Sequence, residues 1–261
     1  MTGRAPAEGP VEWDAHAYDR VADPQEEWGR EVLARLELRG DETVLDAGCG
    51  SGRVTRLLCD RLPAGKVIGV DGSRAMIDAA RQALSGFGDR VELLVADLVD
   101  LELDEPVDAI FSNATFHWIL DHDRLFGRLF APLRPGGVIE AQCGGEGNVA
   151  EWQRALEAAQ GDERFVAYLR GMAVAYNFAS VADTEARLAR AGFEAERVWL
   201  ERKQFQPREP REFARAVGLA KHLARLPPEL HDEFVDAVLG SMARPLVLRY
   251  VRLNISARRA G

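Results

Sequence analysis

Cysteine is scarce in this chain, and its spacing excludes the common cysteine-based architectures. The 261 residues include 3 cysteines, at positions 49, 59 and 143. Residues so far apart match neither a disulfide framework nor a zinc-binding pattern. We therefore expect reduced thiols, as in a cytoplasmic protein, and no metal site.

Long apolar runs and an excess of basic residues are missing as well. No segment is apolar over the length that a bilayer requires, and residues 1–10 lack the apolar core of a signal peptide. The chain has 42 acidic and 33 basic residues, for a formal net charge of -9. An acidic chain has no general attraction for phosphate backbones. We expect a small-molecule substrate, neither nucleic acid nor a membrane as partner, and a monomer or a homodimer.

What the chain does contain is a repeated alternation of strand and helix. Hydrophobic residues make up 47% of it, which suits one domain of good size. Five apolar, β-rich segments alternate with helical segments, and such an order predicts a parallel sheet with helices on both faces. The expected strands are residues 44–45, 66–71, 91–97, 106–113 and 138–142.

The second half of the chain departs from this alternation. Residues 193–206 and 245–256 are typical of a long strand pair that adds an antiparallel edge to a parallel sheet. The predicted fold class is therefore α/β, a doubly wound, mostly parallel seven-stranded sheet with an antiparallel edge strand and helical lid insertions. We treat residues 1–261 as a single domain. Its segments outside the sheet are an N-terminal lid over residues 10–40, with a helix at 25–38, and helical insertions at 146–180 and 207–244.

A glycine turn follows the first expected strand. Gly48, Gly50 and Gly52 alternate there, two residues after Asp46. Glycine lets backbone N–H groups approach a ligand closely, and the strand–turn–helix order places them at the carboxyl edge of the sheet. The dinucleotide fingerprint G-x-G-x-x-G would need a third glycine where Arg53 stands, so the spacing argues against an NAD-dependent oxidoreductase.

Acidic residues end the next two expected strands. Asp71 ends the second strand and Asp97 ends the third. An acid at the end of the second strand can accept hydrogen bonds from both hydroxyls of a ribose. NAD-dependent enzymes share this feature, so it indicates a ribose-containing ligand without identifying it.

The pattern D-x-G-x-G-x-G, from Asp46 to Gly52, resembles motif I of class I S-adenosylmethionine (SAM)-dependent methyltransferases. The strand that ends in Ser112-Asn113 resembles motif IV of that family, and the turn Leu133-Arg134-Pro135-Gly136-Gly137 is similar to another of its segments. The resemblance implies SAM as cofactor and S-adenosylhomocysteine as product. It implies cofactor contacts at Asp46, Gly48, Cys49, Gly50, Asp71, Gly72, Met76, Ala96, Asp97, Leu98 and Asn113.

The segment from Ser112 to Trp118 is similar to trans-aconitate, malonyl-acyl-carrier-protein and juvenile-hormone-acid methyltransferases. This resemblance implies O-methylation of a carboxylate, and the apolar insertions favour a largely apolar acid. The candidate substrate-binding residues are Tyr18, Gln25, Trp28, His117 and Trp118, with Trp28 also suited to a core position.

Other functions stay open at this point. A phenolic or alcoholic hydroxyl acceptor would need a base, and His117 is then the candidate catalytic residue. A structural histidine beside Trp118 is an equal alternative for it. A SAM-binding protein without transferase activity is a further class. Arg170, Lys221 and His222 are candidate anchors for a substrate anion or, alternatively, surface charges.

Overall fold

Seven strands form one sheet in the computed structural model, which describes residues 23–172 and 176–261. The strands are β1 (Thr43–Ala47), β2 (Lys66–Asp71), β3 (Val91–Val95), β4 (Val107–Asn113), β5 (Leu133–Gly144), β6 (Phe193–Phe205) and β7 (Leu248–Arg259). Their spatial order is β3-β2-β1-β4-β5-β7-β6. The order reverses next to β1, and in such open sheets ligands bind at the carboxyl ends around that point.

The predicted fold class is confirmed. Neighbours from β3 to β5 pair in parallel, whereas β7 runs antiparallel to both β5 and β6. The antiparallel strand itself therefore lies one position inside the edge, and β6 is the edge strand. The pairing of β6 with β7 extends from Phe193 to Phe205, in agreement with the two long strands predicted for these segments.

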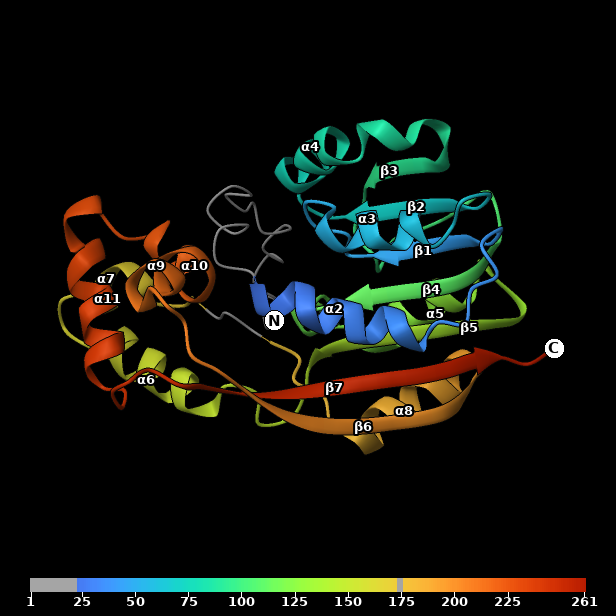
Figure 1. Ribbon diagram of the computed structural model, residues 1–261. Helices are drawn as coiled ribbons and strands as arrows, with labels where there is room; N and C mark the ends of the chain where they lie inside the picture. The colour runs from blue at the N-terminus through green and yellow to red at the C-terminus, as the bar shows by residue number, and fades with distance from the viewer. Residues whose placement is uncertain (1–22, 173–175) are drawn as a thin grey trace, which may run out of the picture.

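Helices cover both faces of the sheet (Figure 1). On one face are α2 (Asp23–Arg35), α3 (Arg53–Asp60) and α4 (Arg74–Ala83), the last followed by η1 (Ser85–Arg90). Val32 and Leu36 pack there with Val44 and Leu58. On the other face α5 (His122–Phe130) packs against α8 (Val181–Ala191), which lies on the edge strand β6, and η2 (Phe116–Trp118) stands between β4 and α5 in the chain.

The two helical insertions join into one body, here called the helical unit. Trp152 and Phe165 of the first insertion share an apolar cluster with Phe213 and Phe234 of the second. The rings of Phe165 and Phe234 meet edge to face at 5.0 Å. The elements of the unit are α6 (Ala150–Gln160), α7 (Val166–Leu169), α9 (Pro210–Phe213), η3 (Ala214–Gly218), α10 (Ala220–Leu223), η4 (Pro228–Leu230) and α11 (His231–Gly240).

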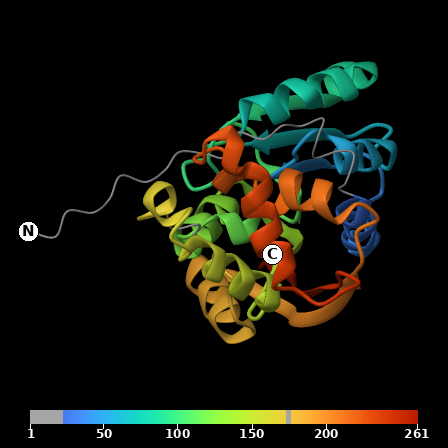
Figure 2. The same cartoon turned by 90° about the vertical axis from the view of Figure 1, so that its left-hand side faces the viewer.

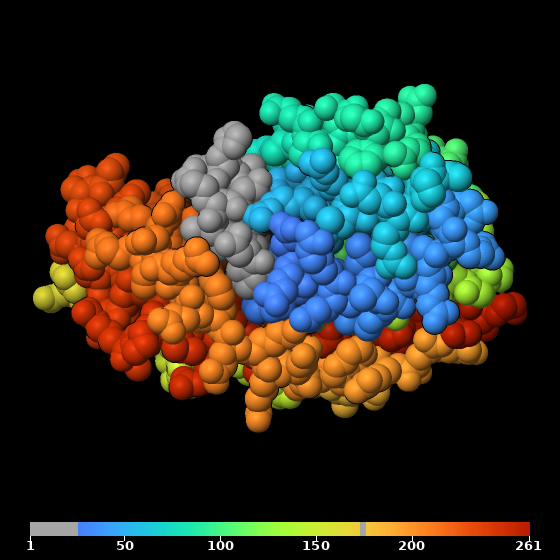
Figure 3. Space-filling view, in the orientation of Figure 1, coloured from blue at the N-terminus to red at the C-terminus, as the bar shows by residue number. Residues whose placement is uncertain are grey.

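The helical unit lies beyond the carboxyl ends of the parallel strands. Figure 1 shows it at one end of the sheet, and Figure 2, viewed from that end, shows α11 in front of the strands. In the space-filling view its orange and red atoms form a mass beside the blue and teal α/β part (Figure 3). The unit is thus placed next to the edge where a ligand of this fold binds.

Several element boundaries differ from the prediction, and two of the differences have a visible physical cause. The helix expected over 25–38 ends at Arg35, because Arg61 donates to the backbone oxygens of Leu33 and Leu36 and closes that end. The strand expected over 138–142 begins earlier, at Leu133, and the pairing with β4 shifts register across the proline–glycine segment. That segment is an irregularity within the strand rather than a stop before it.

Candidate functional site

The glycine turn after β1 is tied to the neighbouring strand. The backbone N–H groups of Gly48 and Cys49 both donate to the Val70 oxygen, at 2.8 and 3.0 Å. Gly48, Gly50 and Gly52 have φ values of 91°, 54° and 88°. A residue with a side chain is strained at these positive φ values, whereas glycine is not. The conformation of the turn therefore requires glycine at these positions.

The three glycines differ in what faces the missing side chain. A Cβ on Gly48 would lie 2.0 Å from Thr115 Oγ1, and one on Gly52 would lie 3.0 Å from Leu84 Cδ1. A Cβ on Gly50 would meet no described atom within 4 Å. Gly48 and Gly52 therefore permit close packing within the protein, whereas Gly50 offers bare backbone to open space.

Asp71 connects the end of β2 to the glycine turn. Its Oδ2 accepts the backbone N–H of Gly50 at 3.0 Å, and its Oδ1 accepts that of Ser73 at 2.8 Å. The carboxylate is half-buried. These bonds fix the position of the carboxylate beside Gly50, at the ligand edge of the sheet.

Asp97 follows β3 at the same edge of the sheet. The Ala96 N–H donates to the Asp71 backbone oxygen at 3.1 Å, which brings the two acidic strand ends together. The Asp97 side chain is exposed and accepts the backbone N–H two residues further on. The side chain of Leu98, by contrast, packs in the core beneath the sheet edge.

Asp46 lies behind the turn rather than at its surface. The side chain is buried in β1, and its Oδ2 accepts from Thr55 Oγ1 of α3 at 2.7 Å. Burial raises the pKa of this carboxyl to about 7, and the charge of Asp71 acts in the same direction. Burial also raises the pKa of the Cys49 thiol. The structure thus places both side chains to support the turn from within, and their predicted contacts with the cofactor stay predictions.

The other predicted cofactor residues lie around the same strand ends. Ser73 Oγ caps α4 by accepting from Met76 N at 3.3 Å, and Gly72 precedes this cap. The Met76 side chain is buried against the protein. Asn113 ends β4, and a Cβ on Gly29 would lie 3.1 Å from Asn113 Nδ2, so α2 crosses closely over this end.

His117 occupies η2, directly after β4. Its Nδ1 accepts the backbone N–H of Gly144 at 3.3 Å. A backbone N–H can only donate, so Nδ1 carries the lone pair and Nε2 carries the proton of the neutral ring. Burial and the nearby charge of Arg252 hold the pKa of His117 well below its usual value. The imidazole is therefore a neutral group that presents an N–H donor at Nε2.

Aromatic rings surround this imidazole. The ring centroid of His117 lies 5.1 Å from that of Trp118 and 5.9 Å from that of Phe178, and Tyr176 stacks on Phe178 at 5.0 Å. Burial raises the pKa of Tyr176 to about 12, which keeps its phenol neutral. The predicted pair His117 and Trp118 is thus part of an aromatic wall.

The predicted substrate residues of the N-terminal lid are placed only in part. Tyr18 lies outside the described residues, and Gln25 lies in the first turn of α2. Trp28 is buried, with its ring 4.9 Å from that of Tyr250 and 4.9 Å from the Arg252 guanidinium carbon. This is the core position that we weighed for Trp28, and contact with substrate stays a prediction.

Arg252 is a buried cation that the sequence analysis missed. Only 2% of this residue is exposed, and its Nε donates to Gln142 Oε1 at 3.2 Å. In the sequence it groups with Arg249 and Asn254 as the polar side of an alternating strand, which suggests a solvent-facing position. Helix α2 covers that side of the strand. The sequence of β7 alone does not indicate this cover.

The three candidate anion anchors separate clearly. Lys221 of α10 places its Nζ 4.9 Å from the Trp118 ring centroid, and burial lowers its pKa. His222 instead stacks on Phe234 within the helical unit, and burial lowers its pKa to about 4. Arg170 is exposed. Of the three, Lys221 lies beside the aromatic wall.

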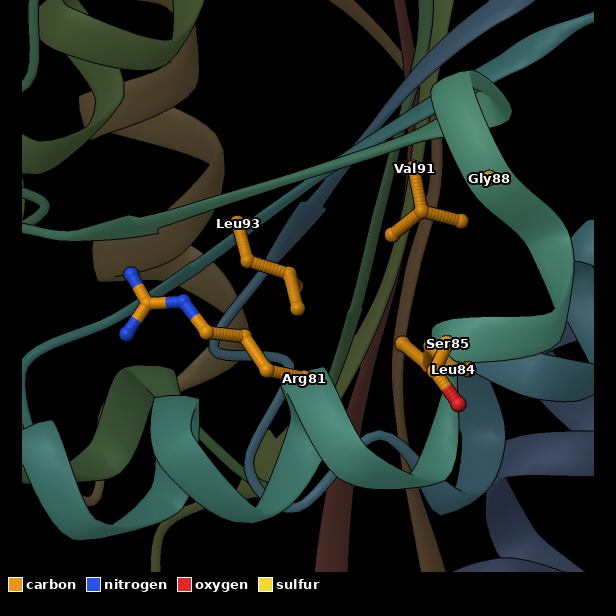
Figure 4. Close-up of a pocket in the computed structure, with 6 residues that line it drawn as sticks. All are labelled: Arg81, Leu84, Ser85, Gly88, Val91 and Leu93. Carbon is orange, nitrogen blue, oxygen red and sulfur yellow. The ribbon is translucent and has the colours of Figure 1, made fainter.

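A separate surface hollow of about 200 Å³ lies between α4 and β3 (Figure 4). Arg81 and Leu84 line it from the helix side, and Val91 and Leu93 from the strand. Val91 begins β3, so the hollow extends to the amino end of that strand, away from the ligand edge. It plays no part in the candidate site.

Residues 23–172 and 176–261 contain no candidate metal site. No three His, Cys, Asp or Glu side chains among them are grouped so that they could hold a metal ion. Within the same residues, no helix is long and apolar enough to cross a membrane.

Comparison with known proteins gives one consistent result. Residues 44–137 match the family model described as a methyltransferase domain. A trans-aconitate 2-methyltransferase of Methylobacterium nodulans is 31% identical over 262 residues, which cover 95% of this chain and 99% of that protein. One of Methylobacterium radiotolerans is 32% identical over 87% of each chain. The match to the relative of Azoarcus sp. is 44% identical but spans 50% of each chain.

Solved structures share the fold at lower identity. Phosphoethanolamine N-methyltransferase 2 of Haemonchus contortus, in complex with SAM, has a TM-score of 0.62 at 22% identity, over 95% of this chain and 57% of that one. The [4+2]-cyclase SpnF has a TM-score of 0.61 at 18% identity, over 99% and 87%. The same architecture therefore occurs with different chemistries.

Proposed function

Because the chain belongs to the class I SAM-dependent methyltransferases, we propose that it transfers the methyl group of SAM to a carboxylate oxygen of a small acid. The observation that carries the choice of acceptor is the hydrogen bond from Gly144 N–H to His117 Nδ1. It supports a role for the imidazole as a hydrogen-bond donor rather than as a base.

The residues around the glycine turn fit the cofactor. None of the described atoms lies within 4 Å of where a Gly50 side chain would begin, and the Gly50 N–H is bonded to the Asp71 carboxylate. We assign the ribose hydroxyls to Asp71 and the adenine to the segment around Asp97. When bound, SAM supplies an electrophilic methyl group on a sulfonium sulfur.

A carboxylate acceptor asks little chemistry of the protein. Its pKa lies near 4, so it is ionised at neutral pH and needs no base. The task left to the chain is to hold one carboxylate oxygen in line with the methyl group. A neutral His117, with its proton on Nε2, suits this task because it donates to the anion without competing for a proton.

The relatives support an acid as substrate but not an apolar one. The Methylobacterium relatives are named for trans-aconitate, which is itself a carboxylate. The apolar residues of the insertions, Phe165, Leu219 and Phe234 among them, are buried against one another in the helical unit. They therefore lend no support to an apolar substrate, and the aromatic wall of Trp118, Tyr176 and Phe178 is the remaining apolar contribution.

The alternative acceptor is a phenolic or alcoholic hydroxyl with His117 as base. The occupied Nδ1 and the lowered pKa of His117 both argue against it. A SAM-binding protein without transferase activity stays as the third reading.

The helical unit, in this proposal, covers the acceptor. Lys221 on α10 contacts Trp118 on η2, which links the unit to the site. Addition of S-adenosylhomocysteine together with an acid should slow amide hydrogen exchange at 150–169 and 210–240. Unchanged exchange in both segments would count against a lid.

The acceptor is tested with labelled SAM and matched compounds. The panel is trans-aconitate, a phenol, an alcohol and an amine, each incubated with the protein and with an Asp71→Ala variant. We expect label in a product from the acid that mild base releases as methanol. A base-stable methyl ether or amine would overturn the proposal, and no transfer to any compound would favour the third reading.

A further inference from the structure

A chain of polar side chains, all buried except the partly exposed Arg35, lies between α2 and the β5–β7 pair. Its members are the side chains of Arg35, Glu140, Gln142, Arg252 and Asn254, of which the last four are each less than 9% exposed. Arg35 comes from α2, and the others come from β5 and β7. Buried polar groups are costly unless they bond to one another, so this arrangement is held by its own hydrogen bonds.

The bonds fix the direction of each amide. Arg35 Nη1 donates to Asn254 Oδ1 at 3.2 Å, and Gln142 Nε2 donates to the same oxygen at 2.9 Å. Gln142 must therefore turn its Oε1 the other way, where it accepts from Arg252 Nε. Arg35 is itself anchored by Glu140, whose Oε2 lies 2.6 Å from Arg35 Nε. The result is that the Arg252 side chain has one enforced orientation.

Trp28 also contacts Arg252. Its ring lies 4.9 Å from the Arg252 guanidinium carbon, which places an aromatic ring against the cation. The Nε bond and the ring together constrain the plane of the guanidinium. A guanidinium held in one plane matches the two oxygens of a carboxylate, as a lysine ammonium does not.

Arg252, held by these contacts, lies close to the hydrogen bond of His117. In the β5–β7 ladder Arg252 lies opposite Gly144, the residue whose N–H donates to His117 Nδ1. One strand position thus links the fixed guanidinium to the fixed imidazole. The charge of Arg252 acts on the His117 ring and helps to keep it neutral.

We propose that Arg252 is the anion anchor of the acceptor site: its guanidinium binds a carboxylate of the acid substrate, next to the Nε2–H of His117. This inference rests on the proposed carboxylate acceptor. Gln142, Asn254, Arg35 and Glu140 are positioning residues, which act through Arg252 and need not touch the substrate.

The test measures binding apart from turnover. Titration calorimetry follows trans-aconitate binding to the protein loaded with S-adenosylhomocysteine, for wild type, Arg252→Gln and Arg252→Lys. We expect Arg252→Gln to raise the Kd by about 30- to 100-fold, as for loss of a charged hydrogen-bonding partner. Arg252→Lys keeps the charge without the planar fork and should raise it by about tenfold. S-adenosylhomocysteine affinity should stay within about twofold.

Arg249→Gln is the matched control. Arg249 lies on the same strand but is exposed and paired with Glu151. It should bind trans-aconitate like wild type. If Arg252→Gln does not fold, Arg252→Lys carries the test, with KM and kcat measured separately. An anchor raises KM and changes kcat little, whereas a merely structural residue would weaken S-adenosylhomocysteine binding as well.

The outcomes separate this inference from the proposed function. Methylation of the acid with unchanged trans-aconitate affinity in both Arg252 variants would overturn the anchor and leave the function standing. Arg252-dependent binding of trans-aconitate without methylation of any acid would overturn the function and leave the anchor standing. Failure of the wild-type protein to bind trans-aconitate, succinate or benzoate would overturn the anchor.

Discussion

The two halves of the site are built in different ways. The proposed cofactor half, from Asp46 to Asp97, consists of backbone groups and acids at the ends of three strands that are close in sequence. The proposed acceptor half consists of the side chains of Trp28, His117 and Arg252, which come from three distant segments. The first half is fixed by local chain geometry, and the second exists only once α2, η2 and β7 have packed.

Substitutions in the two halves should therefore affect different properties of the protein. In the cofactor half, a change of backbone freedom should damage either the fold or SAM binding. In the proposed acceptor half, a change of side-chain chemistry should leave the fold and SAM binding largely intact. It should change only the binding and methylation of the acid substrate.

Gly48 and Gly50 provide the largest contrast within one turn. Gly48→Ala places a Cβ 2.0 Å from Thr115 Oγ1 and should lower the free energy of unfolding by about 3–5 kcal/mol, from steric overlap plus the left-handed φ. Gly50→Ala meets no described atom and should cost about 1–2 kcal/mol, from the left-handed φ alone, yet weaken SAM binding more than tenfold.

Urea unfolding and SAM calorimetry measure the two quantities. Thr115→Gly removes the overlapping atoms, so it should restore part of the stability of Gly48→Ala and none of the SAM binding of Gly50→Ala. Equal loss of stability in the two glycine variants would contradict the assignment.

Asp46 should make the stability of the folded protein depend on pH. Its folded-state pKa, about 7, lies above the value near 4 expected in the unfolded chain. The stability that its protonated form supports is therefore complete below pH 4, falls as the pH rises towards 7, and stays lost above. Asp46→Asn should abolish this loss and raise the free energy of unfolding at pH 8 by up to about 4 kcal/mol, with little change at pH 4.

Denaturant unfolding at pH 4, 6 and 8 checks this prediction. SAM affinity of the Asn variant at pH 8 should stay within about fivefold of wild type if Asp46 only supports the turn. A wild-type stability with the same pH profile as the Asn variant would show that Asp46 is ionised in the folded protein.

Asp71 separates the direct ligand contact from the buried support. Asp71→Ala removes the acceptor for Gly50 N–H and the proposed acceptor for the ribose hydroxyls, and should weaken SAM binding by about 1.5–3 kcal/mol. Calorimetry measures the loss, with Asp78→Ala on α4 as an exposed control. Wild-type affinity in Asp71→Ala would refute the ribose assignment.

The sequence predicted the cofactor half better than the acceptor half for a physical reason. The bounds of β2, residues 66–71, were predicted to the residue because an apolar run between a proline–glycine break and an acidic end is a local signal. The end of α2 was not, because Arg61 of another element sets it. Arg252 escaped notice because its burial depends on α2, more than 200 residues earlier in the chain.

His117→Gln tests the central claim, that His117 donates a hydrogen bond to a carboxylate acceptor and takes no proton. The variant keeps an N–H donor near the position of Nε2 but cannot act as a base. A pH profile alone decides less, because the lowered pKa of His117 would move a base-dependent limb below about pH 6.5.

The measurement is the single-turnover rate of methyl transfer to trans-aconitate at saturating SAM and acid, at pH 7.5, with His231→Gln as control. We predict a rate within about tenfold of wild type in His117→Gln, with a base-labile ester as product. A loss of about 10²–10⁴, the size expected on removal of a general base, would contradict it.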